Sequence, residues 1–158
     1  MQGIYRIIEV RMFKNYTLVI CRRTIHDDHG IPRPQLLLGL KKRGFGVDKY
    51  NGFGGKVESG ETMREAAVRE LKEESGLHAN ALRMRGTLLF YMRDSSKIMN
   101  VGVYECTDFS GDLAESDEMI PQWFDESGIP LHRMWPDDAH CIPCFLSSSN
   151  FSGRHMSS

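Results

Sequence analysis

Residues 55–77 read GKVESGETMREAAVRELKEESGL and concentrate charge of one sign on a segment with helical character. On a helix at about 100° per residue, Glu70, Glu73 and Glu74 fall side by side, at positions i, i+3 and i+4. Like charges at this spacing repel one another, by up to about 3 kcal/mol where the effective dielectric is near 20. We therefore expect a bound cation beside these three carboxylates.

The alternative is a solvated helix face, which would mix charges of both signs. Met63, Ala66 and Ala67 project on the same side of the helix as Glu70 and Glu74. The carboxylates therefore border the buried stripe of the helix, and we expect them to line a cleft.

The segment fills every fixed position of the pattern G-x5-E-x7-R-E-U-x-E-E-x-G-U, in which U is a bulky aliphatic residue. This pattern resembles the Nudix box, whose family hydrolyses a nucleoside diphosphate linked to another group. The resemblance implies an α/β fold, namely an α/β/α sandwich in which helices flank a mixed sheet. The residues that fill the pattern are Gly55, Glu61, Arg69, Glu70, Leu71, Glu73, Glu74, Gly76 and Leu77.

Carboxylate oxygens are hard ligands that suit Mg²⁺, with Mn²⁺ as the alternative, and such ions commonly bridge enzymes to phosphates. With the resemblance, Glu70, Glu73 and Glu74 are the expected metal ligands, joined by the carbonyl of Gly54. Glu74 is the best candidate to orient or deprotonate the attacking water. Arg69 is expected to hold the glutamates in place, with Glu73 as its i, i+4 partner.

Two glycines and a lysine come just before the expected helix. Gly54 and Gly55 lack side chains and so allow the backbone to approach a metal or phosphate closely. Lys56 suits a phosphate oxygen. A plain strand-to-helix turn is the alternative explanation for the glycines, and the two are compatible. Rival phosphate motifs fail, because no Ser or Thr follows Lys56 and no third glycine completes a dinucleotide fingerprint.

The chain has 158 residues, 41% of them hydrophobic, which predicts a single domain over 1–158 with a core at about 16–146 and a weakly structured tail at 147–158. Its net charge of -1 argues against duplex nucleic acid and membrane surfaces as partners. We find no apolar run of spanning length and no signal-peptide core. We expect a cytoplasmic monomer, with the nucleus and mitochondria as alternative locations.

Cysteines and histidines offer no second site. Cys21, Cys106, Cys141 and Cys144 form no disulfide framework, and Cys141-x-x-Cys144 lacks a second pair and a thioredoxin-like context. Residues 26–29, His-Asp-Asp-His, lie in a stretch with Pro and Gly that predicts a solvated loop.

Apolar runs and turn residues predict a mixed order of strands and helices. We expect strands at 16–21, 36–42, 51–53, 82–92, 98–106 and 119–124, helices at 63–75 and 137–146, turns at 94–96 and 109–112, and a loop within 22–35.

The Nudix box handles only the diphosphate, so the rest of the substrate must be recognised by other residues. Three stretches, KKRGFG at 41–46, NGFGGK at 51–56 and MWPDD at 134–138, resemble the MutT-type hydrolases of oxidised purine nucleoside triphosphates within the Nudix family. This resemblance runs from about Leu36 to Phe145. It implies hydrolysis of small purine nucleotides, 8-oxo-dGTP and 2-hydroxy-dATP, to the monophosphate and pyrophosphate, which cleanses the nucleotide pool.

The expected base-recognition residues have suitable chemistry. Asn51 offers a donor and an acceptor, and Trp135 offers a stacking plane. Asp137 and Asp138 are close enough to share one proton, and would then present a donor and an acceptor to a purine edge. The alternative for 135–138, which includes Pro136, is a helix start with an Asp cap and a buried Trp.

The same resemblance marks further residues that would otherwise be plain core or surface. Glu118 matches an additional metal ligand beyond the box. The matching pocket-lining residues are Thr17, Lys41, Phe45, Phe53, Phe90 and Met99.

Three departures from the family pattern stand out. Residues 22–35 are longer than the family's first hairpin connection, and the segment before Phe13 also looks extra. After Gly153, where the family continues into another strand, the chain ends in RHMSS. We expect the last strand of the fold to be missing and a sheet edge to be exposed.

Two other functions stay open at this point. A Nudix enzyme for nucleotide sugars, dinucleoside polyphosphates or capped RNA would keep the box without needing Asn51 together with Asp137 and Asp138. A binding module would use the same acids and pocket but show no turnover.

Overall fold

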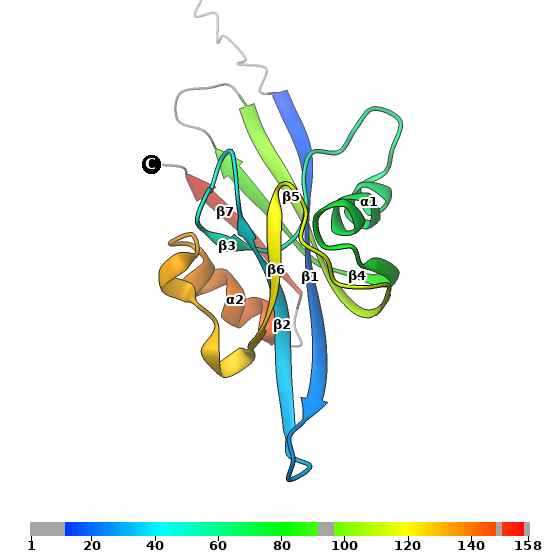
Figure 1. Ribbon diagram of the computed structural model, residues 1–158. Coiled ribbons are helices and arrows are strands. Elements are labelled where there is room, and N and C mark those ends of the chain that lie inside the picture. The colour runs from blue at the N-terminus through cyan, green and yellow to red at the C-terminus, as the bar shows by residue number, and fades with distance from the viewer. Residues whose placement is uncertain (1–11, 92–96, 148–149, 157–158) are drawn as a thin grey trace, which may run out of the picture.

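The computed structural model describes residues 12–91, 97–147 and 150–156. These residues form two helices and a sheet of seven strands. Strand β1 runs parallel to β5, and β4 runs parallel to β7, whereas the other neighbouring strands are antiparallel. The strand order is β3-β2-β1-β5-β4-β7, and β6 also pairs with β2 (Figure 1). The elements are β1 (Met12–His26), β2 (Pro32–Lys41), β3 (Tyr50–Asn51), α1 (Met63–Ser75), β4 (His78–Tyr91), β5 (Lys97–Ser110), β6 (Met119–Asp125), two 3-10 turns (Glu126–Gly128 and Leu131–Arg133), α2 (Asp138–Leu146) and β7 (Phe151–Met156). The predicted mixed sheet and α/β class are confirmed.

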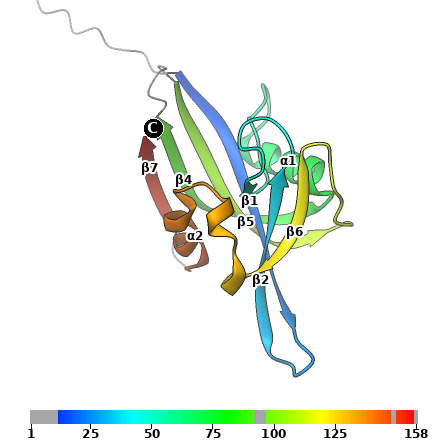
Figure 2. The ribbon, with the colours of Figure 1, turned by 60° about the vertical axis from the view of Figure 1, so that its left-hand side comes forward.

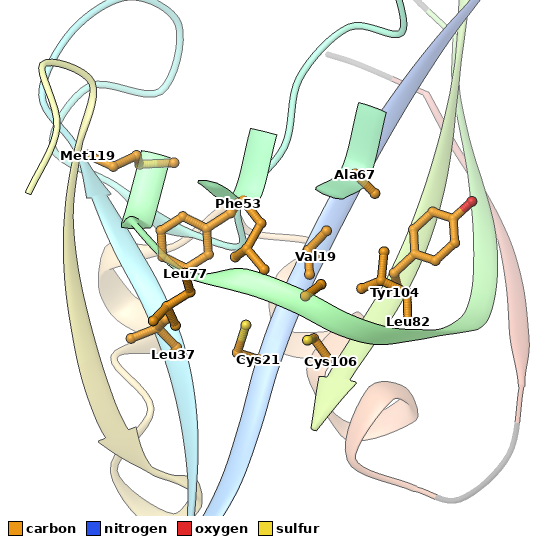
Figure 3. Close-up of a cluster of buried hydrophobic side chains, with 12 residues drawn as sticks. Val19, Cys21, Leu37, Phe53, Ala67, Leu77, Leu82, Tyr104, Cys106 and Met119 are labelled. Carbon is orange, nitrogen blue, oxygen red and sulfur yellow. The ribbon is translucent and has the colours of Figure 1, made fainter. Parts of the chain in front are cut away.

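Alternating side chains of the strands build two apolar cores on opposite faces of the sheet. Val19 and Cys21 of β1 point to the face covered by α1, where they pack with Ala67 (Figure 3). Ile20, between them in the chain, packs on the other face with Phe145 of α2. The helices therefore cover opposite sides of the sheet, as the α/β/α prediction required.

The sheet forks at β2, and the fork positions the glycine-rich segment. β2 pairs with β1 only as far as Cys21 and Leu37, and beyond that point residues 50–57 lie between the two strands. The amide of Thr17 donates to the carbonyl of Gly55 at 2.9 Å, and a Cβ on Gly54 would lie 1.9 Å from the carbonyl oxygen of Thr17. Only glycine fits at position 54, because the two backbones are in contact there.

Helix α1 has the bounds that the sequence predicts. Thr62 and Glu65 form a capping box at its start, and Gly76, with φ of 79°, ends it in a left-handed conformation. These local signals fix both ends of the helix that carries the glutamates.

Two expectations about the strands are wrong in their bounds. The loop within 22–35 is confined to residues 27–31, because β1 and β2 pair down to His26 and Pro32 and form a long hairpin that projects from the body (Figure 1). The expected turn at 109–112 begins later, since β5 runs to Ser110. The expected turn at 94–96 lies outside the described residues.

The last strand is present. Residues 151–156 form β7, which pairs in parallel with β4 from Gly86↔Phe151 to Tyr91↔Met156 at the edge of the sheet (Figure 2). The expectation of a weakly structured tail is therefore wrong for these residues. Among the described helices, none is long and apolar enough to cross a membrane.

Candidate active site

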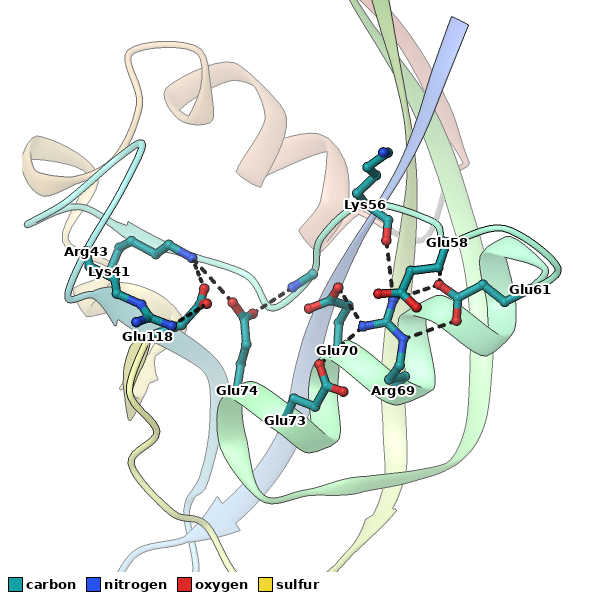
Figure 4. Close-up of polar contacts among 11 residues, drawn as sticks. Lys41, Arg43, Lys56, Glu58, Glu61, Arg69, Glu70, Glu73, Glu74 and Glu118 are labelled. Carbon is teal, nitrogen blue, oxygen red and sulfur yellow. Dashed lines mark hydrogen bonds and ion pairs between the residues drawn. The ribbon is translucent and has the colours of Figure 1, made fainter.

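The glutamates of α1 face the glycine-rich segment in the fork of the sheet (Figure 4). The side chain of Glu74 is 5% exposed and that of Glu70 is 15% exposed, whereas Glu73, at 59%, reaches into solvent. Glu70 and Glu74 are therefore the buried members of the set, and Glu73 is the exposed one.

Arg69 binds the acidic residues around it. Its guanidinium lies 2.9 Å from Glu70 and 3.2 Å from Glu73, which confirms the predicted i, i+4 contact. Its closest partner is Glu61, which accepts two hydrogen bonds from it, at 2.6 Å and 3.1 Å. The carbonyl of Lys56 also accepts from Arg69, at 3.3 Å. Arg69 thus joins the glycine-rich segment to the helix.

Glu74 is held from two sides. Its Oε2 accepts a 2.9 Å hydrogen bond from the amide of Gly54, and its Oε1 lies 3.5 Å from Nζ of Lys41. Burial raises the pKa of Glu74 to about 7, although the Gly54 amide and Lys41 oppose this rise. Burial also raises the pKa of Glu70, against the effect of Arg69.

Glu118, which comes just before β6, joins the same cluster from the other side. Its carboxylate lies 2.9 Å from Nζ of Lys41 and 2.9 Å from Arg43. The hydrogen bonds from these two cations lower the pKa of Glu118. Burial lowers the pKa of Lys41, but the hydrogen bond to Glu118 and the charge of Glu74 outweigh it, so the net shift is upward. Lys41 therefore belongs to the carboxylate cluster.

The donors present fit a hard divalent cation. Among the described residues no three acids converge closely enough to hold one: Arg69 binds Glu70 and Glu73 as one pair, and Lys41 binds Glu74 and Glu118 as another. A Cβ on Gly55 would lie 2.4 Å from Oε1 of Glu70, so the missing side chain leaves room for that carboxylate. Carboxylate oxygens, such as those of Glu70 and Glu74, are the ligands that such an ion prefers.

A cavity lies on the other side of the glycine-rich segment, between the sheet and α2. Its polar wall includes Asn51 and Asp138, two residues predicted to contact a base. Its apolar wall comes from strands, the loop before α2 and α2 itself. The lining residues are Leu18, Ile20, Asn51, Gly52, Leu88, Val103, Met134, Asp138, Cys141, Ile142, Phe145 and Phe151.

Several of these lining residues were missed from the sequence. Leu18, Cys141 and Phe151 come from three distant segments, and each resembles ordinary core in its local context. One signal was available for Cys141, since it follows Asp138 by three residues on a helix and so shares its face.

Other predicted contact residues lie around the cavity. Phe90 and Met99 are partners on β4 and β5 and pack on the α2 face of the sheet. Trp135 is half-buried and stacks on the ring of Phe45, with centroids 4.9 Å apart. Asp138 accepts a 2.9 Å hydrogen bond from the amide of Trp135. The alternative of a helix start is right in that α2 begins at Asp138, but no Asp side chain caps the helix and Trp135 is only half-buried.

The remaining predicted contacts are placed elsewhere. Phe53 is fully buried in the core beneath α1 and does not line the cavity. Thr17 points by strand alternation to the α1 face, and its buried Oγ1 has no hydrogen-bond partner among the described residues. Lys56 is exposed, as is Pro136, which stands between Trp135 and Asp137.

Comparisons with known proteins agree with this geometry. Residues 14–145 match the NUDIX domain family. The chain is 48% identical over 119 residues to an oxidized purine nucleoside triphosphate hydrolase of Danio rerio, covering 75% of this chain and 76% of the relative. It is 42% identical over 140 residues to a protein of the same name from Mus musculus, covering 88% and 83%.

Solved structures show the same fold. A MutT protein from Bacillus halodurans superposes with a TM-score of 0.70 at 22% identity, covering 90% of this chain and 89% of that protein. The match to the NUDIX domain family covers most of the chain. The arrangement of the glutamates beside the glycine-rich segment agrees with that match. The chain belongs to the Nudix family of hydrolases.

Proposed function

We propose that this protein hydrolyses oxidised purine nucleoside triphosphates, such as 8-oxo-dGTP and 2-hydroxy-dATP, to the monophosphate and pyrophosphate. One observation carries the proposal: a single short segment serves both the cavity and the carboxylates. Asn51 lines the cavity, and Gly54 binds Glu74 three residues later. Three extended residues span at most about 10 Å. One nucleotide can therefore place its base in the cavity and its phosphates beside Glu74. The names of the relatives from Danio rerio and Mus musculus support the same substrate class.

In this proposal the carboxylates of Glu70, Glu73, Glu74 and Glu118, with the carbonyl of Gly54, hold the divalent ion. Mg²⁺ is the proposed ion, and when bound it neutralises phosphate charge and makes an attacking water more acidic. Glu74 orients that water and accepts its proton, because its carboxylate is fixed beside the glycine-rich segment by the amide of Gly54.

The surrounding residues keep the acids in position. Arg69 holds Glu70 and Glu73, and it fixes Glu61 as well. Lys41 compensates Glu74 and Glu118 and lies where a phosphate oxygen could also be bound.

Base recognition is assigned to Asn51 and the pair Asp137 and Asp138. A proton shared between the two acids lets one cavity present either a donor or an acceptor at the same place. Oxidised guanine and oxidised adenine differ in this pattern, so the shared proton allows both to bind. Trp135 and Phe45, stacked on each other, would cover the base.

The test is product analysis on a panel of nucleotides. Purified protein is incubated with 8-oxo-dGTP, 2-hydroxy-dATP, dGTP, a nucleotide sugar and a dinucleoside polyphosphate, each with Mg²⁺ and with EDTA. We expect monophosphate and pyrophosphate from the two oxidised nucleotides, only with Mg²⁺. Preferential cleavage of the sugar or dinucleotide would assign another Nudix substrate, and binding without turnover would indicate a binding module. A monomer in the cytoplasm, built as one domain, completes the proposal.

A further inference from the structure

Arg85 of β4 is the largest fully buried side chain among the described residues, at 1% exposure. A charged side chain that is removed from water is costly unless other groups compensate it. Its position in the sheet, next to Gly86, which pairs with Phe151 of β7, places it beside the α2 side of the cavity.

The contacts of Arg85 reach the end of α2. One guanidinium nitrogen donates to the carbonyl of Ser147, the residue that caps α2, and the guanidinium lies 5.1 Å from the centre of the Phe145 ring. The other terminal nitrogen donates to Glu105 of β5 at 2.9 Å. Arg85 thus links the last turn of α2 to the middle of the sheet.

Helix α2 has little stability of its own. It has nine residues, and Pro143 inside it has no N–H to donate to the preceding turn. Helices of this length are marginal in water, and their stability depends on tertiary contacts. The same helix supplies Asp138, Cys141 and Phe145 to the cavity. An anchor at its C-terminal end therefore affects where these side chains stand.

Glu105 is shared with a second arginine. Arg22 of β1 lies 3.4 Å from Glu105 and 2.6 Å from Glu126. Both of these carboxylates lie outside α2. Two arginines therefore bind Glu105, and of these two it is Arg85 that reaches α2 through Ser147 and Phe145.

We propose that Arg85 is a positioning residue for base recognition: it holds α2 against the sheet through Ser147 and Phe145 and so sets the shape of the cavity. The kinetic part of this inference rests on the proposed function. The anchoring of α2 itself does not depend on which substrate is used.

Three variants separate anchoring from charge burial. Arg85→Met removes the hydrogen bonds to Ser147 and Glu105 and, among the described residues, leaves Glu105 with Arg22. The double variant Arg85→Met with Glu105→Met also removes the carboxylate, because an apolar pair in place of a buried ion pair is often neutral for stability. Arg22→Met is the matched control, since it removes a cation from the same carboxylate while the contacts of Arg85 with α2 stay in place.

The first readout is amide hydrogen exchange of peptides from α2 and α1. Loss of a charge-assisted hydrogen bond is worth roughly tenfold or more in an equilibrium constant. We expect exchange in α2 to rise roughly tenfold in Arg85→Met and in the double variant, with α1 unchanged.

The second readout is the KM and kcat for 8-oxo-dGTP. KM should rise roughly tenfold while kcat stays within about threefold, because the glutamates of α1 are untouched.

The double variant decides the question. If it melts like the wild type but keeps the fast α2 exchange and the raised KM, positioning by Arg85 is supported. If α2 exchange and KM return to wild-type values, the effect came from the buried Glu105 carboxylate with only Arg22 to compensate it, and the proposal is overturned. The proposal is also overturned if Arg22→Met reproduces the loosening of α2. Should the wild type hydrolyse no nucleotide of the panel, the proposed function fails, and hydrogen exchange alone still decides the anchor.

Discussion

The amide of Gly54 donates a 2.9 Å hydrogen bond to Oε2 of Glu74, which joins the segment in the fork of the sheet to the helix that carries the acids. Gly54 is in backbone contact with Thr17 on its other side. A movement of β1 relative to α1 would therefore be transmitted to Glu74. The position of this carboxylate depends on the fold of the sheet as much as on the helix.

Glu74→Gln is expected to lower kcat by about 100-fold or more, because the amide cannot accept a proton from the water or bind a cation as a carboxylate does. The far-ultraviolet circular dichroism spectrum should be unchanged. Glu115→Gln is the matched control, since Glu115 is exposed and contacts Lys42. A rate within a few-fold of the wild type at saturating Mg²⁺ would move the catalytic role to Glu73 or Glu118.

Stability without metal should depend on pH through Glu74. Burial raises its pKa from 4.5 to about 7. Between these values the folded state keeps a proton that the unfolded state releases, so the free energy of unfolding falls as pH rises. The expected loss is about 3 kcal/mol, and Glu74→Gln should not show it. Urea denaturation in EDTA at pH 5 and pH 8 measures this difference. Equal pH dependence in wild type and Glu74→Gln would contradict the pKa shift.

Substitution of Gly54 or of Gly55 by alanine should affect different properties of the protein, namely its stability and its Mg²⁺ requirement. In Gly54→Ala the new Cβ would lie 1.9 Å from the backbone of Thr17, whereas in Gly55→Ala it would lie 2.4 Å from the carboxylate of Glu70. Backbone cannot move aside, so Gly54→Ala should lose about 3 kcal/mol of stability. The Glu70 side chain can rotate, so Gly55→Ala should lose about 1 kcal/mol or less and need roughly tenfold more Mg²⁺ for activity.

Urea denaturation and Mg²⁺ titrations of activity would check both variants. Gly128→Ala serves as the control, because a Cβ there meets nothing within 4 Å. A wild-type Mg²⁺ requirement in Gly55→Ala would show that the room beside Glu70 is not used by the ion.

Asp137→Asn and Asp138→Asn should change base preference more than overall rate. Each substitution fixes the donor pattern and leaves one of the two oxidised bases with an unpaired buried group, at a cost of about 1–3 kcal/mol or roughly 5- to 150-fold in kcat/KM. The measurement is kcat/KM for 8-oxo-dGTP, 2-hydroxy-dATP and dGTP. A uniform drop on all three would mean that the acids support the turn at Trp135, consistent with the hydrogen bond from its amide to Asp138.

The sequence predicts α1 well because its signals are local. Thr62, Glu65 and Gly76 fix its ends, and the spacing of the glutamates follows from helical geometry. It also predicts the contact of Arg69 with Glu73, for the same reason. Helix ends and side-chain contacts within one turn of a helix can be inferred without knowing the rest of the fold.

The hairpin and β7 could not be predicted because their pairing depends on distant residues. Arg33 and Gln35 of β2 both bind Asp125 of β6, an arrangement that no local pattern indicates. β7 includes Ser152 and Gly153, which have low strand propensity, and it forms a strand through its pairing with β4. The cavity escaped prediction in the same way, since its wall comes from segments as distant as Leu18 and Phe151.

Strand alternation sends Val19 toward α1 and its neighbour Ile20 toward α2. A single codon change on the α2 side can therefore reshape the cavity while the glutamates keep their geometry. After a gene duplication, one copy could drift toward a different damaged base without passing through an inactive intermediate. Mutant libraries aimed at new base preferences would accordingly be confined to α2 and the start of β7, which line the cavity and contribute no residue to the carboxylate cluster.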